Sequence, residues 1–281
     1  FRSLDGSCVL KPVSGSGSEL IFSCHTERVC TERFRDIQNG LNVRRSSRMY
    51  RTGPNAAPAI LAEELVEGPE FSCDFIVEDD RLDILRLTGK VIDAAAPFGT
   101  ARAYVLPADL PPQIDRRCFE RTLLESARAV GITRALCMLD FMVRGDEILL
   151  MEIAPRPGGD CIPFLLKTAW NLDILKLNLN FARKRPHPPI RPPMPGPYLG
   201  LRFHARKSGT LRRIDASRLA RDPRVVNIHL IRKPGDDIRM PPENYDNWVL
   251  GHAVVRPFKE PGPADQCRDL TNLLLVEIGE P

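Results

Sequence analysis

Several features are missing from the 281-residue sequence, and each absence excludes a class of possible functions. No stretch approaches the roughly 18 consecutive apolar residues that a membrane-spanning helix needs, and no signal peptide is visible. The sequence therefore predicts a cytoplasmic protein that does not bind membranes. The eight cysteines include no CxxC pair, and most lie among apolar residues, as Cys137 does. We therefore expect buried free thiols rather than a metal site or a nucleophile.

Basic residues are never interleaved with aromatic residues on one segment, which argues against a nucleic-acid surface. The formal net charge of +4 is spread along the chain. The densest basic cluster, Arg44, Arg45, Arg48 and Arg51, fits a solvated helix end or a phosphate-facing edge better. What is present is ordinary globular composition, 43% hydrophobic and 27% charged, enough for a large core and two or more subdomains.

Hydrophobic patterns predict the α+β class, with mostly antiparallel strands. Strands are expected at 8–12, 20–24, 60–66, 71–77, 82–87, 134–143 and 147–153, and helices at 27–42, 114–130 and 162–182. The proline-rich residues 186–197 form a linker. Residues 1–66 and 67–185 are the expected small and large subdomains, and 198–281 a strand-rich C-terminal domain. Because the chain starts with Phe1 shortly before a strand, a preceding segment is expected.

A pair of carboxylates is the first candidate site. Asp140 and Glu152 lie on adjacent strands of the hairpin predicted around residues 144–146. Two carboxylates at one point repel unless a cation lies between them, and Mg²⁺ prefers one or two carboxylates together with nucleotide phosphates. Arg156 follows in a loop stiffened by prolines, which suits a charged ligand. Two exposed acids at strand ends are the alternative interpretation.

Two further segments suit a nucleotide. Lys11 ends a strand, and a loop of small residues follows whose backbone amides can surround phosphate oxygens. The loop residues are Ser14, Gly15, Ser16, Gly17 and Ser18. A second strand end offers backbone groups to an adenine edge through Glu63, Glu64, Leu65 and Val66. Beyond the turn, Glu70 could hold ribose hydroxyls. A mobile hairpin tip and an acidic turn are the respective alternatives.

The order of these segments, over residues 8–182, resembles the ATP-grasp superfamily, in which ATP lies between two α+β subdomains. The resemblance implies ATP as the nucleotide, with Lys11 on the phosphates under the 14–18 loop. It places the adenine hinge at 63–66 and a ribose ligand at Glu70. Lys90 lies where D-alanine–D-alanine ligases have a second phosphate lysine.

The same resemblance assigns the metal and the reacting group. Asp140 and Glu152 match ligands of Mg²⁺ (or Mn²⁺), and Arg156 matches an arginine that stabilises a substrate carboxylate or its acyl phosphate. The family usually has Asn where this chain has Ala154, which reduces the metal ligands, and Asp160 is a candidate replacement. The family's N-terminal domain is also absent before Phe1, so the isolated chain is expected to bind ATP without being active.

The C-terminal segments SGTL, KPGDDI and LGHAVV resemble the lid domain of L-amino-acid ligases and of their carbamoyl phosphate synthetase and biotin carboxylase relatives. The expected function is ATP-dependent carboxylate–amine ligation through an acyl phosphate, yielding an amide, ADP and phosphate. The expected partners are a small-molecule carboxylate and amine, with a homodimer left open. The alternatives are a bicarbonate-activating enzyme and an inactive ATP-binding module, which Ala154 would favour.

Overall fold

The computed structural model describes residues 1–15, 17–44, 50, 59–185 and 196–280. Ser16, most of the expected linker and the arginines at 45, 48 and 51 lie outside these ranges. The strands are β1 (Cys8–Pro12), β2 (Phe22–Cys24), β3 (Ile60–Glu64), β4 (Glu70–Glu78), β5 (Arg81–Ile92), β6 (Ala101–Leu106), β7 (Arg134–Arg144), β8 (Glu147–Ala154), β9 (Tyr198–His204), β10 (Gly209–Asp215), β11 (Val225–Leu230), β12 (Asp237–Ile238), β13 (Val249–Val255) and β14 (Leu275–Gly279). The helices are α1 (Glu27–Val43), α2 (Arg116–Ala129), α3 (Ile162–Trp170), α4 (Ile174–Ala182) and α5 (Pro263–Thr271).

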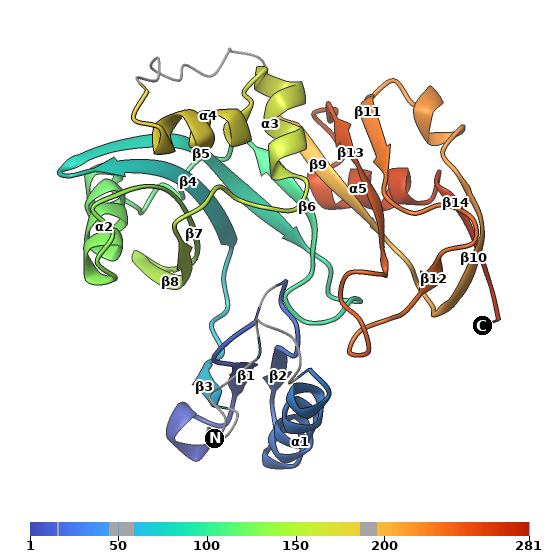
Figure 1. Ribbon diagram of the computed structural model, residues 1–281, viewed down its shortest axis with the longest axis horizontal. Coiled ribbons are helices and arrows are strands. Elements are labelled where there is room, and N and C mark those ends of the chain that lie inside the picture. Colours follow the sequence, from blue (N-terminus) through green and yellow to red (C-terminus); the bar gives the residue numbers. More distant parts are fainter. Residues whose placement is uncertain (16, 45–49, 51–58, 186–195, 281) are drawn as a thin grey trace.

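A small antiparallel sheet, in the order β2-β1-β3, forms the N-terminal part together with α1 and lies below the rest of the molecule in Figure 1. Thr26 caps α1 by accepting a hydrogen bond from the Val29 amide. Gly40 lies inside the helix, where an added Cβ would come within 2.7 Å of a Leu20 methyl group. The predicted β1–β2 hairpin and the helix after it are therefore confirmed, with Gly40 serving close packing.

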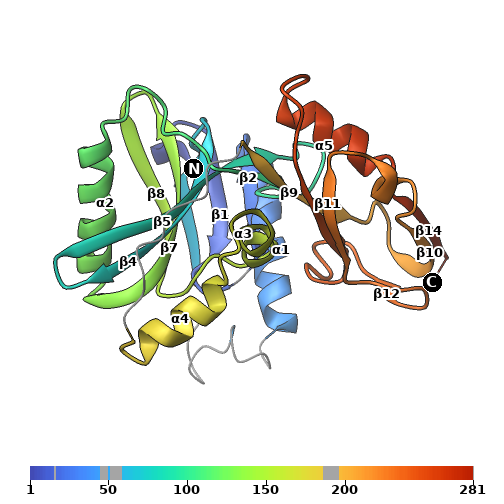
Figure 2. The ribbon, with the colours of Figure 1, turned by 90° about the horizontal axis from the view of Figure 1, so that it is seen from above.

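The main body is one antiparallel sheet in the order β11-β13-β9-β6-β5-β4-β7-β8. Alternation along β4 explains its two faces. Phe71, Cys73, Phe75 and Val77 pack on α2, while Ile76, on the other face, packs under α3 and α4. A third sheet, β12-β10-β14, and α5 lie at the end of the molecule opposite α2 (Figure 2). The predicted α+β class is confirmed.

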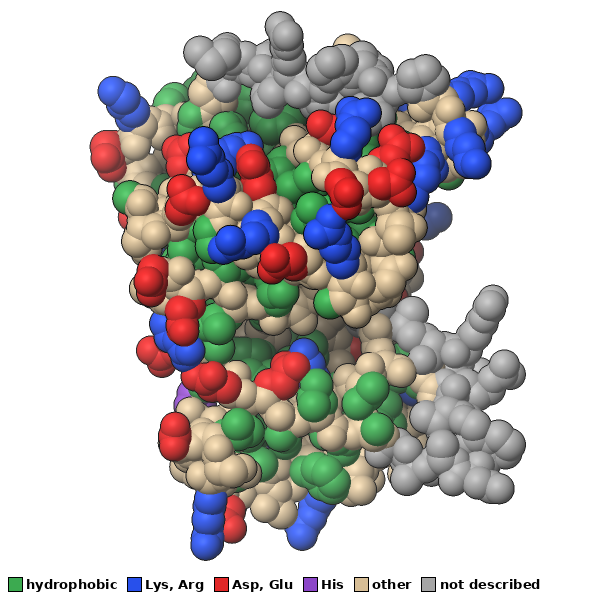
Figure 3. All heavy atoms as spheres, turned by 90° about the vertical axis from the view of Figure 1, so that its left-hand side faces the viewer, with side chains coloured by type: hydrophobic (Ala, Val, Ile, Leu, Met, Phe, Trp, Pro, Cys, Tyr) green, Lys and Arg blue, Asp and Glu red, His purple; other side chains and the backbone are tan. Residues whose placement is uncertain are grey.

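Three sequence-based expectations need correction. The helix predicted over 162–182 is two helices, because Asn171 adopts a left-handed conformation (φ 53°) and Asp173 caps α4 by accepting from the Lys176 amide. Strand β6 was not predicted, and β5 extends to Ile92. β8 forms an edge of the large sheet, where Leu150 and Met151 are 49% and 46% exposed. Charged side chains of both signs are interspersed with apolar ones over this side (Figure 3).

All eight cysteines are free thiols, and six of them are buried, as the sequence predicts. Within the described ranges, none of the helices combines the length and the hydropathy that a bilayer crossing requires.

Candidate functional site

The predicted acidic residues come together on the α3-facing side of the large sheet. In β4, Glu70 precedes Ser72, which is paired across the ladder with Asp140 of β7. Asp140 is in turn paired with Glu152 of β8. The hairpin around 144–146 thus brings the two predicted metal ligands opposite each other, as expected.

A β-bulge produces this alignment. On the turn side of the hairpin, Phe141 pairs with Leu150, whereas Asp140 pairs with Glu152, so Met151 is an extra residue in β8. In a regular ladder Asp140 would pair with Met151, and the Glu152 side chain would point to the other face of the sheet. The bulge therefore returns the Glu152 carboxylate to the face that carries Asp140.

Lys90 of β5 is the cation among these acids. Its Nζ atom donates to Oε1 of Glu70 at 2.5 Å and to Oδ2 of Asp140 at 2.7 Å. Burial acts to lower the pKa of Lys90, but the charges of Asp140 and then Glu70 outweigh it and raise the pKa above its usual value. The side chain is thus a fixed positive charge, only 9% exposed.

The second oxygen of Asp140 has a different status. Among the described residues, no donor forms a hydrogen bond with Oδ1 of Asp140, although that atom is buried. A buried carboxylate oxygen without a partner is costly in an apolar setting and suits a cation instead. With the Glu152 carboxylate across the ladder, these residues fit the hard divalent ion that the sequence predicts. The role of metal ligand stays a prediction for both.

A buried ion pair, which the sequence analysis missed, holds the loop that carries Arg156. Arg86 and Asp74 are both completely buried, and the guanidinium donates to both carboxylate oxygens at 2.8 and 3.0 Å. Oδ1 of Asp74 also accepts from the Gly158 amide at 2.9 Å. Cross-strand ladder pairing places Asp74 opposite Arg86, and no local sequence signal reveals this partnership.

The Arg156 side chain is half exposed. Its Nη1 donates to the Pro157 carbonyl at 3.0 Å, and its Nη2 lies 3.9 Å from Oε1 of Glu152. The guanidinium is therefore beside the acidic cluster and mostly uncommitted. Asp160, the candidate replacement for the missing metal ligand, pairs with Arg202.

A second polar group borders the site. Asp160 adopts a left-handed conformation (φ 58°) and places Oδ2 2.6 Å from Nε of Arg202 on β9. The Tyr104 hydroxyl donates to the same oxygen at 3.2 Å. Burial, followed by the charge of Asp160, raises the pKa of Tyr104 well above its usual value. Tyr104 is paired with Lys90 across β5 and β6, so the acidic cluster and this group belong to one continuous polar surface.

The remaining predicted residues belong to the small subdomain or its exit. Lys11 Nζ lies 2.6 Å from Oε2 of Glu63, while Glu64 pairs with Arg144 at 2.5 Å. Leu65 and Val66 are half-buried between β3 and β4. Ser14, Gly15 and Gly17 are exposed, and Ser18 is close to Gly99, in the connection between β5 and β6. The two predicted phosphate lysines thus come from different sheets.

A cavity of about 1030 Å³ lies elsewhere, between the β4–β5 turn, α2 and the end of α4. Its lining includes Glu78, Arg81, Arg116, Arg134 and Lys184, none of them a predicted site residue. Glu78 and Arg134 form an ion pair at 2.8 Å there. We base the candidate site on the convergence of charged side chains and not on cavity size.

The fold combines a small α+β subdomain with a large antiparallel sheet that carries a cluster of charged side chains. A model of the ATP-grasp domain matches residues 4–164. The chain belongs to the ATP-grasp family, which confirms the resemblance seen in the sequence.

Solved structures with this fold include ligases. The L-amino acid ligase from Bacillus licheniformis superposes with a TM-score of 0.77 at 19% identity, over 97% of this chain and 64% of the ligase. Phosphoribosylglycinamide synthetase from Anaerococcus prevotii superposes with a TM-score of 0.59 at 18% identity, over 99% of this chain and 67% of the synthetase. Carboxyaminoimidazole ribonucleotide synthase from Aspergillus clavatus, in complex with ATP, superposes with a TM-score of 0.63 at 16% identity, over 97% of this chain and 63% of the synthase. At these identities the similarity establishes the fold.

A curated relative is the uncharacterized protein y4rH of Sinorhizobium fredii, 26% identical over 174 residues. The match covers 62% of this chain and 33% of the relative. The chain therefore spans about a third of that relative and just under two thirds of the Bacillus ligase.

Proposed function

We propose that the protein is an ADP-forming carboxylate–amine ligase. The observation that carries this proposal is the cluster of Lys90, Glu70 and Asp140 opposite Glu152. In this cluster, Oδ1 of Asp140 is buried and has no hydrogen-bond partner in the part of the chain that the structure describes. Two carboxylates beside a fixed lysine charge suit a metal–triphosphate complex. The ligases among the structural neighbours support a carboxylate as the second substrate.

In the proposed reaction, Asp140 and Glu152 hold Mg²⁺, and Lys11 and Lys90 contact the phosphates of ATP. Bound Mg²⁺ would neutralise charge on the phosphate oxygens. A substrate carboxylate oxygen attacks the γ-phosphorus, the bond to the β-phosphate oxygen breaks, and ADP leaves. Arg156 orients the carboxylate and then the acyl phosphate through paired hydrogen bonds. An amine nitrogen attacks the acyl carbon, phosphate leaves, and the amine proton passes to solvent.

Lys90 also has a role before nucleotide binds. Its ammonium group neutralises Glu70 and Asp140 at a point where two carboxylates would otherwise repel each other. In the loaded site, Asp140 would help to hold the divalent ion, Lys90 would contact a phosphate, and Glu70 would contact ribose hydroxyls. The same three side chains thus serve the empty and the loaded site.

The test is a screen of phosphate release from ATP by the full-length protein, across pairs of carboxylic and amino acids. A ligase releases phosphate only when both substrates are present. Release driven by bicarbonate instead would assign the protein to bicarbonate activation. Tight ATP binding without turnover in any pair would identify an inactive ATP-binding module, which Ala154 favours, and would refute the proposal.

A further inference from the structure

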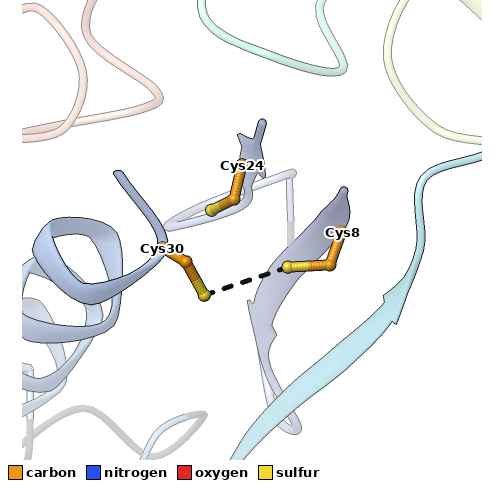
Figure 4. Close-up of side chains that lie close together, drawn as sticks. All are labelled: Cys8, Cys24 and Cys30. Carbon is orange, nitrogen blue, oxygen red and sulfur yellow. Dashed lines mark hydrogen bonds between the residues drawn. The ribbon is translucent and has the colours of Figure 1, made fainter. Parts of the chain in front are cut away.

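Three cysteines from separate elements converge in the core of the small subdomain, and none of them is a predicted site residue. Cys8 begins β1, Cys24 ends β2, and Cys30 lies in the first turn of α1. Cys8 and Cys24 are ladder partners, and α1 brings the third sulfur to them (Figure 4). All three sulfur atoms lie within 4.8 Å of one another, and those of Cys8 and Cys30 are 4.0 Å apart.

The surroundings of the three sulfurs are apolar. Cys8 and Cys24 are completely buried, in a core cluster with Leu10, Leu20 and Ile37. Burial, reinforced by the neighbouring thiols, raises the pKa of Cys24 to about 12, and burial also raises that of Cys8. Without a bound ion these two thiols therefore stay protonated, and the sulfur of Cys8 contacts that of Cys30 at 4.0 Å.

We propose that Cys8, Cys24 and Cys30 form a three-thiolate site for a soft d¹⁰ cation of the Zn²⁺ type. Thiolates about 2.3 Å from a tetrahedral zinc ion are separated from each other by about 3.8 Å. The observed separations of 4.0 Å and up to 4.8 Å are close to this value, so modest side-chain rotation completes the site. Thiolate ligands also select soft ions over Mg²⁺.

Charge balance sets the conditions for binding. A divalent ion displaces one proton from each of the three thiols, the protons pass to solvent, and the occupied site carries one negative charge. Cys30 is in the first turn of α1, where the partial positive charge of the helix N-terminus stabilises the negative charge of the occupied site. Affinity should therefore rise with pH. Three protein ligands leave a fourth position for water or another small ligand.

An ion at this point would join β1, β2 and α1. Cys8 is on the same strand as Lys11, three residues before it. Occupancy should therefore stabilise the subdomain that carries the proposed phosphate lysine, without taking part in the reaction. The inference concerns residues outside the proposed ATP site and is tested without nucleotide.

The experiment is a Cd²⁺ titration of the full chain after reduction and removal of the reductant, followed by the ultraviolet thiolate-to-metal charge-transfer band and repeated with competing Zn²⁺. We expect one ion per chain and a band that Zn²⁺ abolishes. Cys30→Ala, which removes the least buried of the three thiols, should weaken Cd²⁺ binding by more than about 100-fold. Mutating a residue that only hydrogen-bonds to a metal ligand typically weakens binding by about 10- to 100-fold. Cys118→Ala, at an exposed position of α2, is the matched control and should bind Cd²⁺ as the parent does.

A second measurement needs no variant. The thermal unfolding midpoint of the parent should rise with Zn²⁺ and not with equimolar Mg²⁺. The proposal is overturned if the parent shows no charge-transfer band, or if Cys30→Ala binds Cd²⁺ as tightly as the parent. Mass-spectrometric detection of a disulfide between two of the three cysteines, in protein isolated without reductant, would also overturn it.

Discussion

The Nζ atom of Lys90 lies 2.7 Å from Oδ2 of Asp140, so a lysine on β5 neutralises a carboxylate two strands away on β7. Glu70, on the strand between them, shares the same ammonium group at 2.5 Å. One oxygen of Asp140 is thereby occupied, and the other is free for a metal ion.

Glu152→Gln should lower turnover by orders of magnitude and leave the fold intact. The substitution removes one of two expected charges on the metal, while the side chain is 57% exposed and makes few contacts. Steady-state turnover as a function of Mg²⁺ concentration is the measurement. Glu147→Gln, at the start of the same strand, is the control. Unchanged Mg²⁺ dependence in the Glu152 variant would remove the assignment.

Lys90→Met should destabilise the protein without Mg²⁺ and make it more responsive to Mg²⁺. Removing the lysine leaves Glu70 and Asp140 as uncompensated, largely buried charges, at a cost on the order of 3 kcal/mol. Mg²⁺ can then replace the missing charge. Thermal unfolding of parent and variant over a Mg²⁺ series gives the comparison. Equal Mg²⁺-induced shifts in the two proteins would show that the ion binds elsewhere.

Arg156→Lys should reduce kcat more than ATP affinity. A guanidinium can pair through two hydrogen bonds with a carboxylate and then with an acyl phosphate, whereas an ammonium group cannot. Loss of one such interaction, about 2–3 kcal/mol, corresponds to roughly a hundredfold in kcat. Calorimetry of ATP binding beside steady-state turnover separates the two effects. A collapse of ATP affinity with normal turnover at saturation would make Arg156 a nucleotide ligand.

Gly158→Ala should destabilise the protein and displace the Arg156 loop. An added Cβ would lie 2.3 Å from Nη2 of Arg86, whose guanidinium is fixed by Asp74 and cannot retreat. Overpacking of this kind costs about 1–3 kcal/mol. Gly159→Ala is the matched control, because its Cβ first meets Arg156 at 3.7 Å, an ordinary contact. Chemical denaturation measures the free energy of unfolding of both variants. Equal values for the two variants would contradict the rigidity of the Arg86–Asp74 ion pair.

His252 should make the protein sensitive to acid. Burial, and then the charge of His229, lower the pKa of His252 to about 4. Below pH about 6.5, His252 becomes protonated in the unfolded chain but stays neutral in the folded chain. The free energy of unfolding therefore falls as pH drops from 6.5 toward about 4, by roughly 3 kcal/mol at most from this residue.

His252→Phe removes this contribution and keeps a ring against Phe164, whose centroid is 4.7 Å away. The variant should lose less stability than the parent between pH 6.5 and 4. Denaturation at a series of pH values is the measurement, and His25→Phe, at an exposed position, controls for the added phenylalanine. Parallel pH dependence in parent and His252→Phe would contradict the prediction.

Much of the fold could be predicted because local signals agree with the final structure. The β7–β8 hairpin has a compact turn, and the β1–β2 and β7–β8 hairpins both have clear apolar strands. The helix break at Asn171 was missed because apolar periodicity continues through it, and the left-handed residue becomes evident only from the cap geometry. Strand β6 lacks a distinct local pattern, since its pairing is with β5 and the distant β9.

The candidate site was predictable only in part. Alternation along a regular hairpin would place Asp140 and Glu152 on opposite faces, so their shared face depends on the bulge at Met151, which the sequence does not reveal. The resemblance to a family identified the two residues nevertheless. Asp74 and Arg86 lie on consecutive strands, but they face each other only because the β4–β5 register shifts between Asp74 and Phe75. The cysteine cluster depends on how α1 packs against β1 and β2. Local patterns encode neither arrangement.

Strand β9 has a consequence for how the chain can be divided. The family match ends at residue 164. Strand β9, which follows residues 186–195 in the sequence, nevertheless pairs with β6 in the large sheet. A chain shortened to end at Arg185 would leave the hydrogen-bonding edge of β6 unpaired and uncover apolar residues such as Leu106, which is completely buried in the intact sheet. Such an edge invites pairing with other chains. The shortest piece expected to keep the β6 edge paired and its apolar residues covered therefore extends through β13, well past the last residue of the predicted catalytic set.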